Sequence, residues 1–208
     1  MSSLKRVVII IICLIIILSV VLVFNVEDKT KNKEKSLNTT QEYKEKDWKS
    51  MKFKLNKDII SINNSYKSLE KINWYINFDK MGYKNGYKLN ANSKTMMSLK
   101  LNNKYYYDLE VLVGLSNNSD KKIEATKCTI WAIYVNNYNK KTPIAFTLPN
   151  NVTNGSNIEN IKKAYGNPNS IIKEKNHDIY VYQHDYKIQL KLFVYDDIGL
   201  QAFEYKNY

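Results

Sequence analysis

The apolar run near the N-terminus constrains this chain more than any other feature. Residues 7–24, VVIIIICLIIILSVVLVF, are 18 consecutive residues without a charge. As an α-helix, such a run extends about 27 Å, close to the thickness of the hydrocarbon core of a bilayer. No small-x-small cleavage pattern follows, because Phe24, Asn25 and Val26 come next. The run therefore predicts an uncleaved transmembrane anchor, and a cleaved signal peptide is the alternative.

The charges beside this run predict its orientation. Lys5 and Arg6 precede it, and a short cationic end stays in the cytoplasm. Residues 1–6 are then cytoplasmic, and the chain from residue 25 onward lies outside the cell membrane. A lipid anchor on Cys13 is disfavoured because isoleucines, rather than small residues, precede this cysteine.

A charged segment follows the apolar run. Residues 27–50 hold seven lysines and six acidic residues, with few apolar side chains to bury. Such a composition cannot form a core. We therefore expect residues 25–50 to be a flexible charged stalk between the membrane and a folded ectodomain.

The composition also excludes some functions. The chain has 208 residues and a net charge of +12, but only one of its 32 basic residues is an arginine. Proteins that read base sequence rely on the planar arginine side chain, so a specific nucleic-acid partner is disfavoured. The two cysteines, Cys13 and Cys128, stand in separate apolar segments and predict no disulfide framework.

Hydrophobic patterning predicts the elements of the first half of the ectodomain. A strand-like segment at residues 51–62 leads into a short helix that begins near Ser65 and ends at Asn73. Three strand-like runs follow and predict an antiparallel meander. They span residues 95–101, 104–115 and 123–135, and in the middle run Tyr107, Leu109, Val111 and Val113 alternate as one buried face.

The second half repeats this order. A short strand and a proline turn after Pro143 precede a helix, for which Ser156 and Glu159 predict a capping box. Gly166 and Pro168 should end that helix. Strand-like runs at residues 178–183, 187–195 and 199–205 complete the half.

The expected fold class is therefore α+β. An N-terminal transmembrane helix precedes an ectodomain of two repeats, residues 51–142 and 143–208. Each repeat contains a strand, a short helix and an antiparallel meander, with the short helices packed on sheet.

The two histidines are the first candidates for chemistry. His177 and His184 are each followed by an aspartate, Asp178 and Asp185, and a hairpin could bring the four side chains into one metal-binding neighbourhood. The alternative is that they are polar turn residues that flank a strand. A catalytic reading would require these residues to face Asp196 or Asp197 across a cleft.

No other motif indicates a reaction. The turn before the second helix lacks the Gly-Lys-Ser/Thr of a phosphate loop and the Gly-x-Ser-x-Gly of a nucleophile elbow. Cys128 lies in an apolar strand and is interpreted as a core residue. The 17 tyrosines with interspersed lysines suit either half-exposed strand positions or a stacking platform. We therefore expect no cofactor, no metal and no catalytic residue.

The second half also resembles a known pattern. In LPNNVTNGSNIENIKKAYGNPNSI, followed by IYVYQ and KLFVYDDIGLQAFEY, an apolar-proline stretch leads to a helix ending in Ala-Tyr-Gly-x-Pro and then a tyrosine-rich meander. This order resembles uncharacterised membrane-anchored extracytoplasmic proteins of Gram-positive bacteria. Their domains are similar to the helix-plus-sheet unit of the β-lactamase inhibitor protein and of small outer-membrane assembly lipoproteins. The resemblance implies a helix-plus-sheet fold, an extracytoplasmic location and protein binding.

Together these observations predict a single-pass bacterial membrane protein with an extracytoplasmic, non-catalytic binding or interaction module. The basic, tyrosine-rich sheet face is the expected contact surface, and an envelope protein or an anionic wall polymer is the expected partner. The alternatives are an envelope hydrolase, and an inhibitor or regulator of an envelope enzyme.

Overall fold

Antiparallel strands form most of the folded chain. The computed structural model describes residues 46–83, 86–107 and 109–208. The predicted anchor at residues 7–24 and all but the end of the predicted stalk lie outside the described residues. Within the described ranges, no helix is long and apolar enough to cross a membrane.

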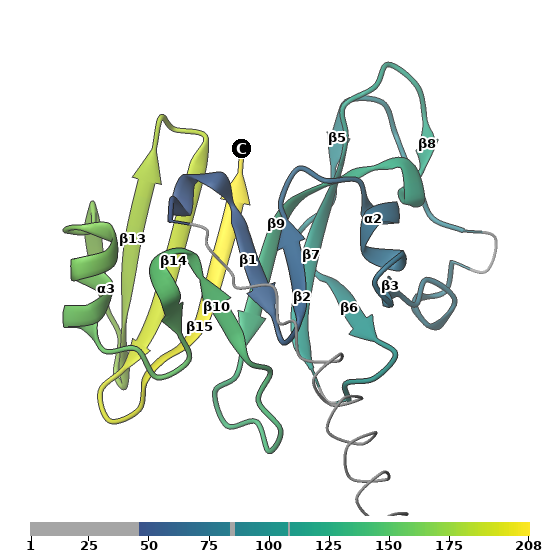
Figure 1. Cartoon of the computed structure of the whole chain (residues 1–208). Coiled ribbons are helices and arrows are strands. Elements are labelled where there is room, and N and C mark those ends of the chain that lie inside the picture. The colour runs from purple at the N-terminus through teal and green to yellow at the C-terminus, as the bar shows by residue number, and fades with distance from the viewer. Residues whose placement is uncertain (1–45, 84–85, 108) are drawn as a thin grey trace, which may run out of the picture. The chain divides into compact units, whose positions relative to one another are not determined.

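A large sheet organises the molecule (Figure 1). Its strands follow the order β12-β13-β14-β15-β9-β7-β6-β3, and β5 also pairs with β7. All the pairings are antiparallel. The strands are β3 (Trp74–Ile76), β5 (Ser93–Lys94), β6 (Leu99–Asn103), β7 (Glu110–Asn117), β9 (Thr129–Asn136), β12 (Ser170–Lys173), β13 (His177–His184), β14 (Ile188–Tyr195) and β15 (Gly199–Asn207).

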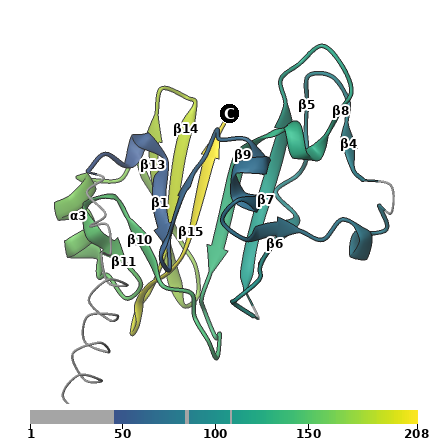
Figure 2. The same ribbon diagram turned by 45° about the vertical axis from the view of Figure 1, so that its right-hand side comes forward.

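Shorter elements lie on one side of this sheet (Figures 1 and 2). A small sheet has the order β11-β10-β1-β2, and β4 pairs with β8 in a separate two-stranded sheet. The strands are β1 (Lys52–Leu55), β2 (Asp58–Ser61), β4 (Lys88–Leu89), β8 (Ile123–Glu124), β10 (Phe146–Leu148) and β11 (Val152–Thr153). The α-helices are α2 (Tyr66–Glu70) and α3 (Ile158–Tyr165), and the 3-10 turns are η1 (Trp48–Ser50), η2 (Asp79–Met81), η3 (Ala125–Lys127) and η4 (Pro149–Asn151).

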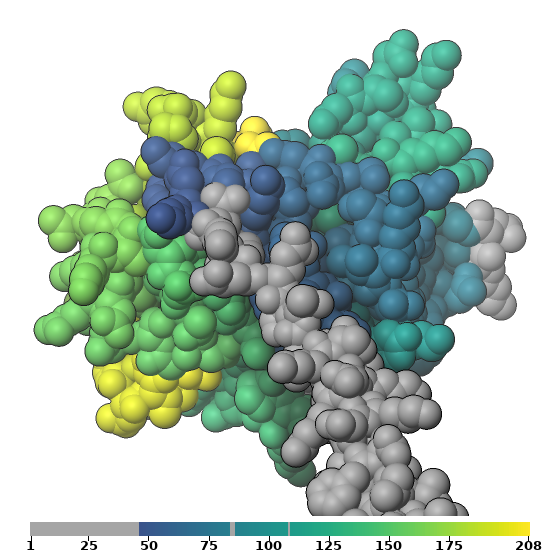
Figure 3. Space-filling model, viewed as in Figure 1, coloured from purple at the N-terminus to yellow at the C-terminus, as the bar shows by residue number. Residues whose placement is uncertain are grey.

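The core lies between the large sheet and these elements. Phe203 on β15 is fully buried and meets the rings of Phe53 and Phe146, each with its centroid 5.0 Å away. On β13, the ring of Tyr182 contacts Tyr165 of α3 edge-on. Each fully buried apolar side chain contributes about 1.5–3 kcal/mol, so this layer is the main source of stability. The space-filling view from the same side shows residues of the small sheet and of helix α3 in front of the large sheet (Figure 3).

Both halves of the chain contribute strands to the large sheet and to the small sheet. In the first half, the hairpin β1–β2 and helix α2 precede β3, β6, β7 and β9 of the large sheet. In the second half, β10–β11 and helix α3 precede β12, β13, β14 and β15. In the large sheet, β9 and β15 pair at the centre, and β3 and β12 lie at the two edges. The small sheet is joined in the same way, through β1 and β10.

An α+β fold was predicted from the sequence, and the structure confirms it at this level, with mostly β-sheet and few helices in the described residues. The strands predicted at residues 178–183, 187–195 and 199–205 match β13, β14 and β15 within a few residues. Strand β12 was missed: its four residues are all exposed at the edge of the sheet, so they leave no pattern of alternation.

The strand predicted at residues 104–115 is shorter than expected, because the chain leaves the sheet between β6 and β7. The Asn103 side-chain oxygen accepts a hydrogen bond from the Tyr105 amide at 2.8 Å, which turns the backbone out of the ladder. Leu109 and Val111 are buried as predicted, whereas Tyr107 is 81% exposed. The predicted alternation therefore fails at Tyr107.

The helix predicted from the capping box forms, but its cap is one residue later. Asn157 is the N-cap, and its side chain accepts from the Asn160 amide at 2.9 Å. The Ser156 hydroxyl instead accepts from the Thr153 amide. The helix ends at Gly166, as predicted, with a positive φ of 79°. The predicted capping box of Ser156 with Glu159 is wrong because the helix begins one residue later, which makes Asn157 the N-cap and leaves the Ser156 hydroxyl to the Thr153 amide.

The end of the predicted stalk is part of the fold. Trp48 packs near Tyr182, with 6.1 Å between ring centroids, and its carbonyl accepts from the Tyr205 hydroxyl at 3.1 Å. Met51 is buried. The compact unit therefore begins before residue 51, because Trp48 supplies an apolar surface that the charge pattern concealed.

The backbones around Gly155 and Gly199 approach each other closely. Gly199 has a φ of +68°, and a Cβ added there would lie 2.5 Å from the Gly155 carbonyl oxygen. Gly82 has a φ of +88° with nothing within 4 Å of such an atom. Gly82→Ala should therefore cost about 1 kcal/mol from backbone strain alone. Gly199→Ala should cost about 1–3 kcal/mol more, because the neighbouring backbone has to move.

Chemical denaturation of the two variants measures this difference in the free energy of unfolding. Equal destabilisation by the two substitutions would contradict the close approach at Gly199.

Candidate functional site

The face of the large sheet opposite the core is the candidate site. The helices and the small sheet all lie on the other side (Figures 1 and 2), and none of the described helices or strands covers this face. We call it the open face. Strand registers place these residues on it: Ile179 and Val181 of β13; Lys191, Phe193 and Tyr195 of β14; Ala202, Glu204 and Lys206 of β15; Ala132, Tyr134 and Asn136 of β9; and Glu110, Leu112 and Gly114 of β7.

A continuous chain of aromatic rings crosses the open face. Tyr134 meets Phe193 edge-on at 5.7 Å, and His177 contacts Phe193 at 5.9 Å between ring centroids. His177 then stacks on Tyr195 at 4.7 Å, and Tyr195 stacks on Tyr138 at 4.1 Å with an interplanar angle of 11°. Burial raises the pKa of Tyr134 to about 12, so its hydroxyl stays neutral at physiological pH. The result is a half-exposed aromatic surface that carries few charges.

Trp131 extends this surface beside a β-bulge. The register between β7 and β9 shifts after Gly114, and the indole lies across that glycine, where an added Cβ would be 2.4 Å from the indole nitrogen. The indole nitrogen donates to the Thr95 carbonyl at 3.1 Å. The Lys94 ammonium lies 5.2 Å from the ring centroid, and Tyr208 lies against another side of the ring. These contacts fix the orientation of the indole.

Most charges in the middle of the open face are paired. Glu204 is buried between two lysines, with its carboxylate 2.8 Å from the Lys206 ammonium and 3.5 Å from that of Lys191. Lys140 lies 2.9 Å from Glu110. Burial alone raises the pKa of Glu110, but hydrogen bonds, including that from Lys140, outweigh it and leave this pKa below its usual value. These lysines therefore pair mainly with carboxylates of the open face itself.

The structure separates the two histidines. His177 and His184 stand at opposite ends of β13, about 23 Å apart at the rise of a β-strand. They are seven residues apart, so they also point to opposite faces of the sheet. His184 instead lies 3.0 Å from its neighbour Asp185. The hypothesis that a hairpin brings them together is wrong, and no group of three or more His, Cys, Asp or Glu side chains among the described residues is placed to hold a metal ion.

The aspartates of the catalytic alternative do share a hollow. Asp178, Asp196 and Asp197 line a depression of about 360 Å³ beside the start of α3. Asp178 accepts hydrogen bonds from the Lys173 ammonium at 2.5 Å and from the Tyr180 hydroxyl at 3.2 Å. The bond from Lys173 holds the pKa of Asp178 below its usual value. Asp178 is therefore a fixed anion rather than a general acid, and sequence reasoning missed Lys173 as its partner.

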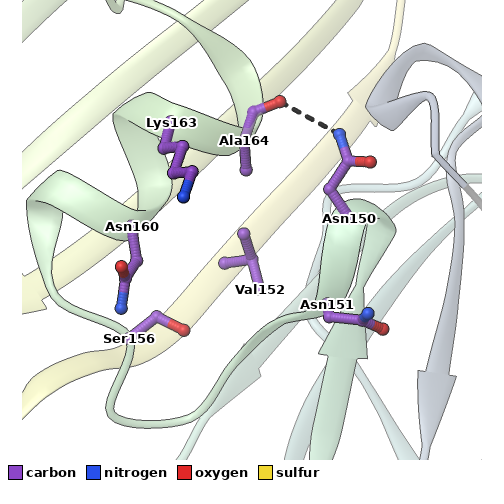
Figure 4. Close-up of a pocket in the computed structure, with 7 residues that line it drawn as sticks. All are labelled: Asn150, Asn151, Val152, Ser156, Asn160, Lys163 and Ala164. Atoms are coloured by element: carbon purple, nitrogen blue, oxygen red, sulfur yellow. Dashed lines mark hydrogen bonds between the residues drawn. The ribbon is translucent and has the colours of Figure 1, made fainter.

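The turn that precedes α3 lines a polar hollow (Figure 4). The Asn150 side-chain amide donates to the Ala164 carbonyl at 3.0 Å, which joins this turn to the end of the helix. The hollow measures about 410 Å³. Its lining consists of Asn150, Asn151, Val152, Ser156, Asn160, Lys163 and Ala164.

Cys128 is a core residue, as interpreted from the sequence. It is buried, and its thiol points to the Glu124 carbonyl, with 3.6 Å between sulfur and oxygen. Burial raises the pKa of this thiol to about 11. The neutral thiol is neither a nucleophile nor a metal ligand at physiological pH.

Comparisons with known proteins add no name to this geometry. A scan against protein-family models, a search of curated proteins and a search of solved structures each found no match to the chain.

Proposed function

We propose that this chain is a single-pass membrane protein of the bacterial envelope, with an extracytoplasmic, non-catalytic binding module. Residues 7–24 would anchor it with the N-terminus in the cytoplasm, and the open face would be its contact surface. The observation that carries the proposal is the aromatic chain from Tyr134 to Tyr138. In a sheet with one covered face, apolar side chains normally point to the core and polar side chains to solvent. An outer face made of aromatic side chains therefore indicates that this face binds another molecule.

The order of strands supports a finer proposal, that residues 51–142 and 143–208 are tandem repeats. Each half supplies a hairpin, one helix and four strands along the main path of the large sheet, to which the first half adds the short strand β5. The halves meet at β9 with β15 and at β1 with β10. This arrangement also fits the proposed likeness to the helix-plus-sheet unit of the β-lactamase inhibitor protein and small outer-membrane assembly lipoproteins.

The charges and the size of the open face favour a protein partner over an anionic wall polymer. Glu204 and Glu110 already pair with the nearest lysines, so few cations remain for phosphates. Aromatic residues with few free charges are typical of the centre of a protein interface. The six adjacent strands from β12 to β7 present on the order of 600 Å², near the roughly 800 Å² that each partner buries in a standard interface.

The hydrolase alternative receives less support from the geometry. It rests on the hollow beside α3, where Asp178 is held by Lys173, and neither histidine lines that hollow. A role as inhibitor or regulator of an envelope enzyme is compatible with the open face, because such a role also requires a protein contact.

Substitution on the open face tests the proposed contact surface. In pull-downs from envelope extract with the full-length chain, Phe193→Glu should reduce capture of a specific partner about tenfold, because a charge replaces a central aromatic ring. Tyr186→Glu is the control, because Tyr186 is 93% exposed in the turn after β13. Equal capture by both variants would contradict the proposal. Binding that falls steeply between low and high salt would instead indicate a polyanion.

Protease added to intact cells after removal of the wall tests the orientation. Cleavage should remove the folded part while a cytoplasmic control protein stays intact, because the positively charged end remains inside. A chain that resists protease until the cells are lysed would contradict the proposed location.

A further inference from the structure

Three connections meet at one end of the molecule, away from the centre of the open face (Figure 1). They are the β1–β2 turn, the β6–β7 connection and the β9–β10 connection. Together they enclose a hollow of about 370 Å³, within the size range of small-ligand sites. Its lining consists of Asn56, Tyr105, Tyr106, Tyr107, Leu109, Thr142, Pro143 and Ile144.

Three consecutive tyrosines form one wall of this hollow. Tyr107 is 81% exposed and Tyr105 is 55% exposed, so two large rings of this wall are open to solvent. Tyr106 packs on the buried Trp74, with 6.4 Å between ring centroids, and anchors the segment. Tyr106 therefore joins this tyrosine segment to the core between the two exposed rings.

Polar groups surround the rings. The Asn56 side chain accepts from the Ala145 amide at 3.1 Å, which fixes its position against the β9–β10 connection. Thr142 adds a hydroxyl to the rim. The ammonium groups of Lys57 and Lys104 each lie 5.8 Å from the centroid of the Tyr105 ring. The lining therefore combines aromatic surface with amide and hydroxyl groups, and two ammonium groups lie beside one of its rings, Tyr105.

We propose that this hollow binds a sugar ring that carries a nearby negative charge, as in an anionic glycan. The apolar C–H face of a pyranose packs on an aromatic ring, as other apolar surfaces do. Amide and hydroxyl side chains exchange hydrogen bonds with its hydroxyl groups. The two lysines supply the partner for a carboxylate or a phosphate. This site is separate from the open face, so a glycan and a protein can be bound together.

Two matched oligosaccharides test the site. The full-length chain, in a detergent without a sugar headgroup, is titrated with a tetrasaccharide of alternating N-acetylglucosamine and N-acetylmuramic acid and with the neutral N-acetylglucosamine tetrasaccharide. These probes differ in the lactyl carboxylate. Calorimetry should give at least fivefold tighter binding of the anionic probe, and Lys57→Ala combined with Lys104→Ala should remove that preference.

Tyrosine variants locate the binding. Tyr107→Ala should weaken binding of the anionic tetrasaccharide about tenfold, in the range of one lost stacking contact. Tyr186→Ala, a substitution of another highly exposed tyrosine away from the hollow, should leave it unchanged. An unaltered affinity in Tyr107→Ala, equal affinity for the two probes, or no binding of either would overturn the proposal. Since Phe193→Glu leaves this hollow intact, glycan binding by that variant separates this site from the open face.

Discussion

The pairing of β9 with β15 is the constraint on which the rest of the structure depends. It places Phe203 opposite Val135 and Tyr205 opposite Ile133, all four on the covered face. The hairpins of both halves then close over this centre, where Phe53 and Phe146 meet Phe203. Neither half can bury its own apolar surface without the other, so the halves form one core rather than two.

This one-sided core explains the chemistry of the opposite face. Because successive side chains of a strand point to opposite faces, each bulky residue directed into the core is followed along the strand by a residue directed to the open face. Near the centre these neighbours are small, as at Ala132, Ala202 and Gly114. Around them lie the aromatic residues and the paired charges. The open face is therefore a surface of ordered aromatic rings and internal ion pairs. Such a surface suits shape-complementary binding of a protein better than electrostatic attraction of a polymer.

The sequence predicted the α+β fold and the meander strands because, in a long run such as β14, the alternation of apolar and polar residues indicates which face is buried. It could not predict which strands pair across the two halves, because that depends on side chains far apart in the chain. Edge strand β12 was missed because its four residues are all exposed, and Trp48 was missed because it stands in a charged segment. The tyrosine-rich face was expected from composition, but the order Tyr134, Phe193, His177, Tyr195, Tyr138 arises only from strand register. The histidines, paired by proximity in sequence, are separated by the length of β13.

Photo-crosslinking in living cells tests the central claim most directly. A photoreactive phenylalanine analogue would replace Tyr195 on the open face or, in a parallel strain, exposed Lys67 on helix α2. The account predicts one discrete crosslinked protein from position 195 and none from position 67. The same adduct from both positions, or an adduct from position 67 alone, would contradict the assignment of the open face as the contact surface.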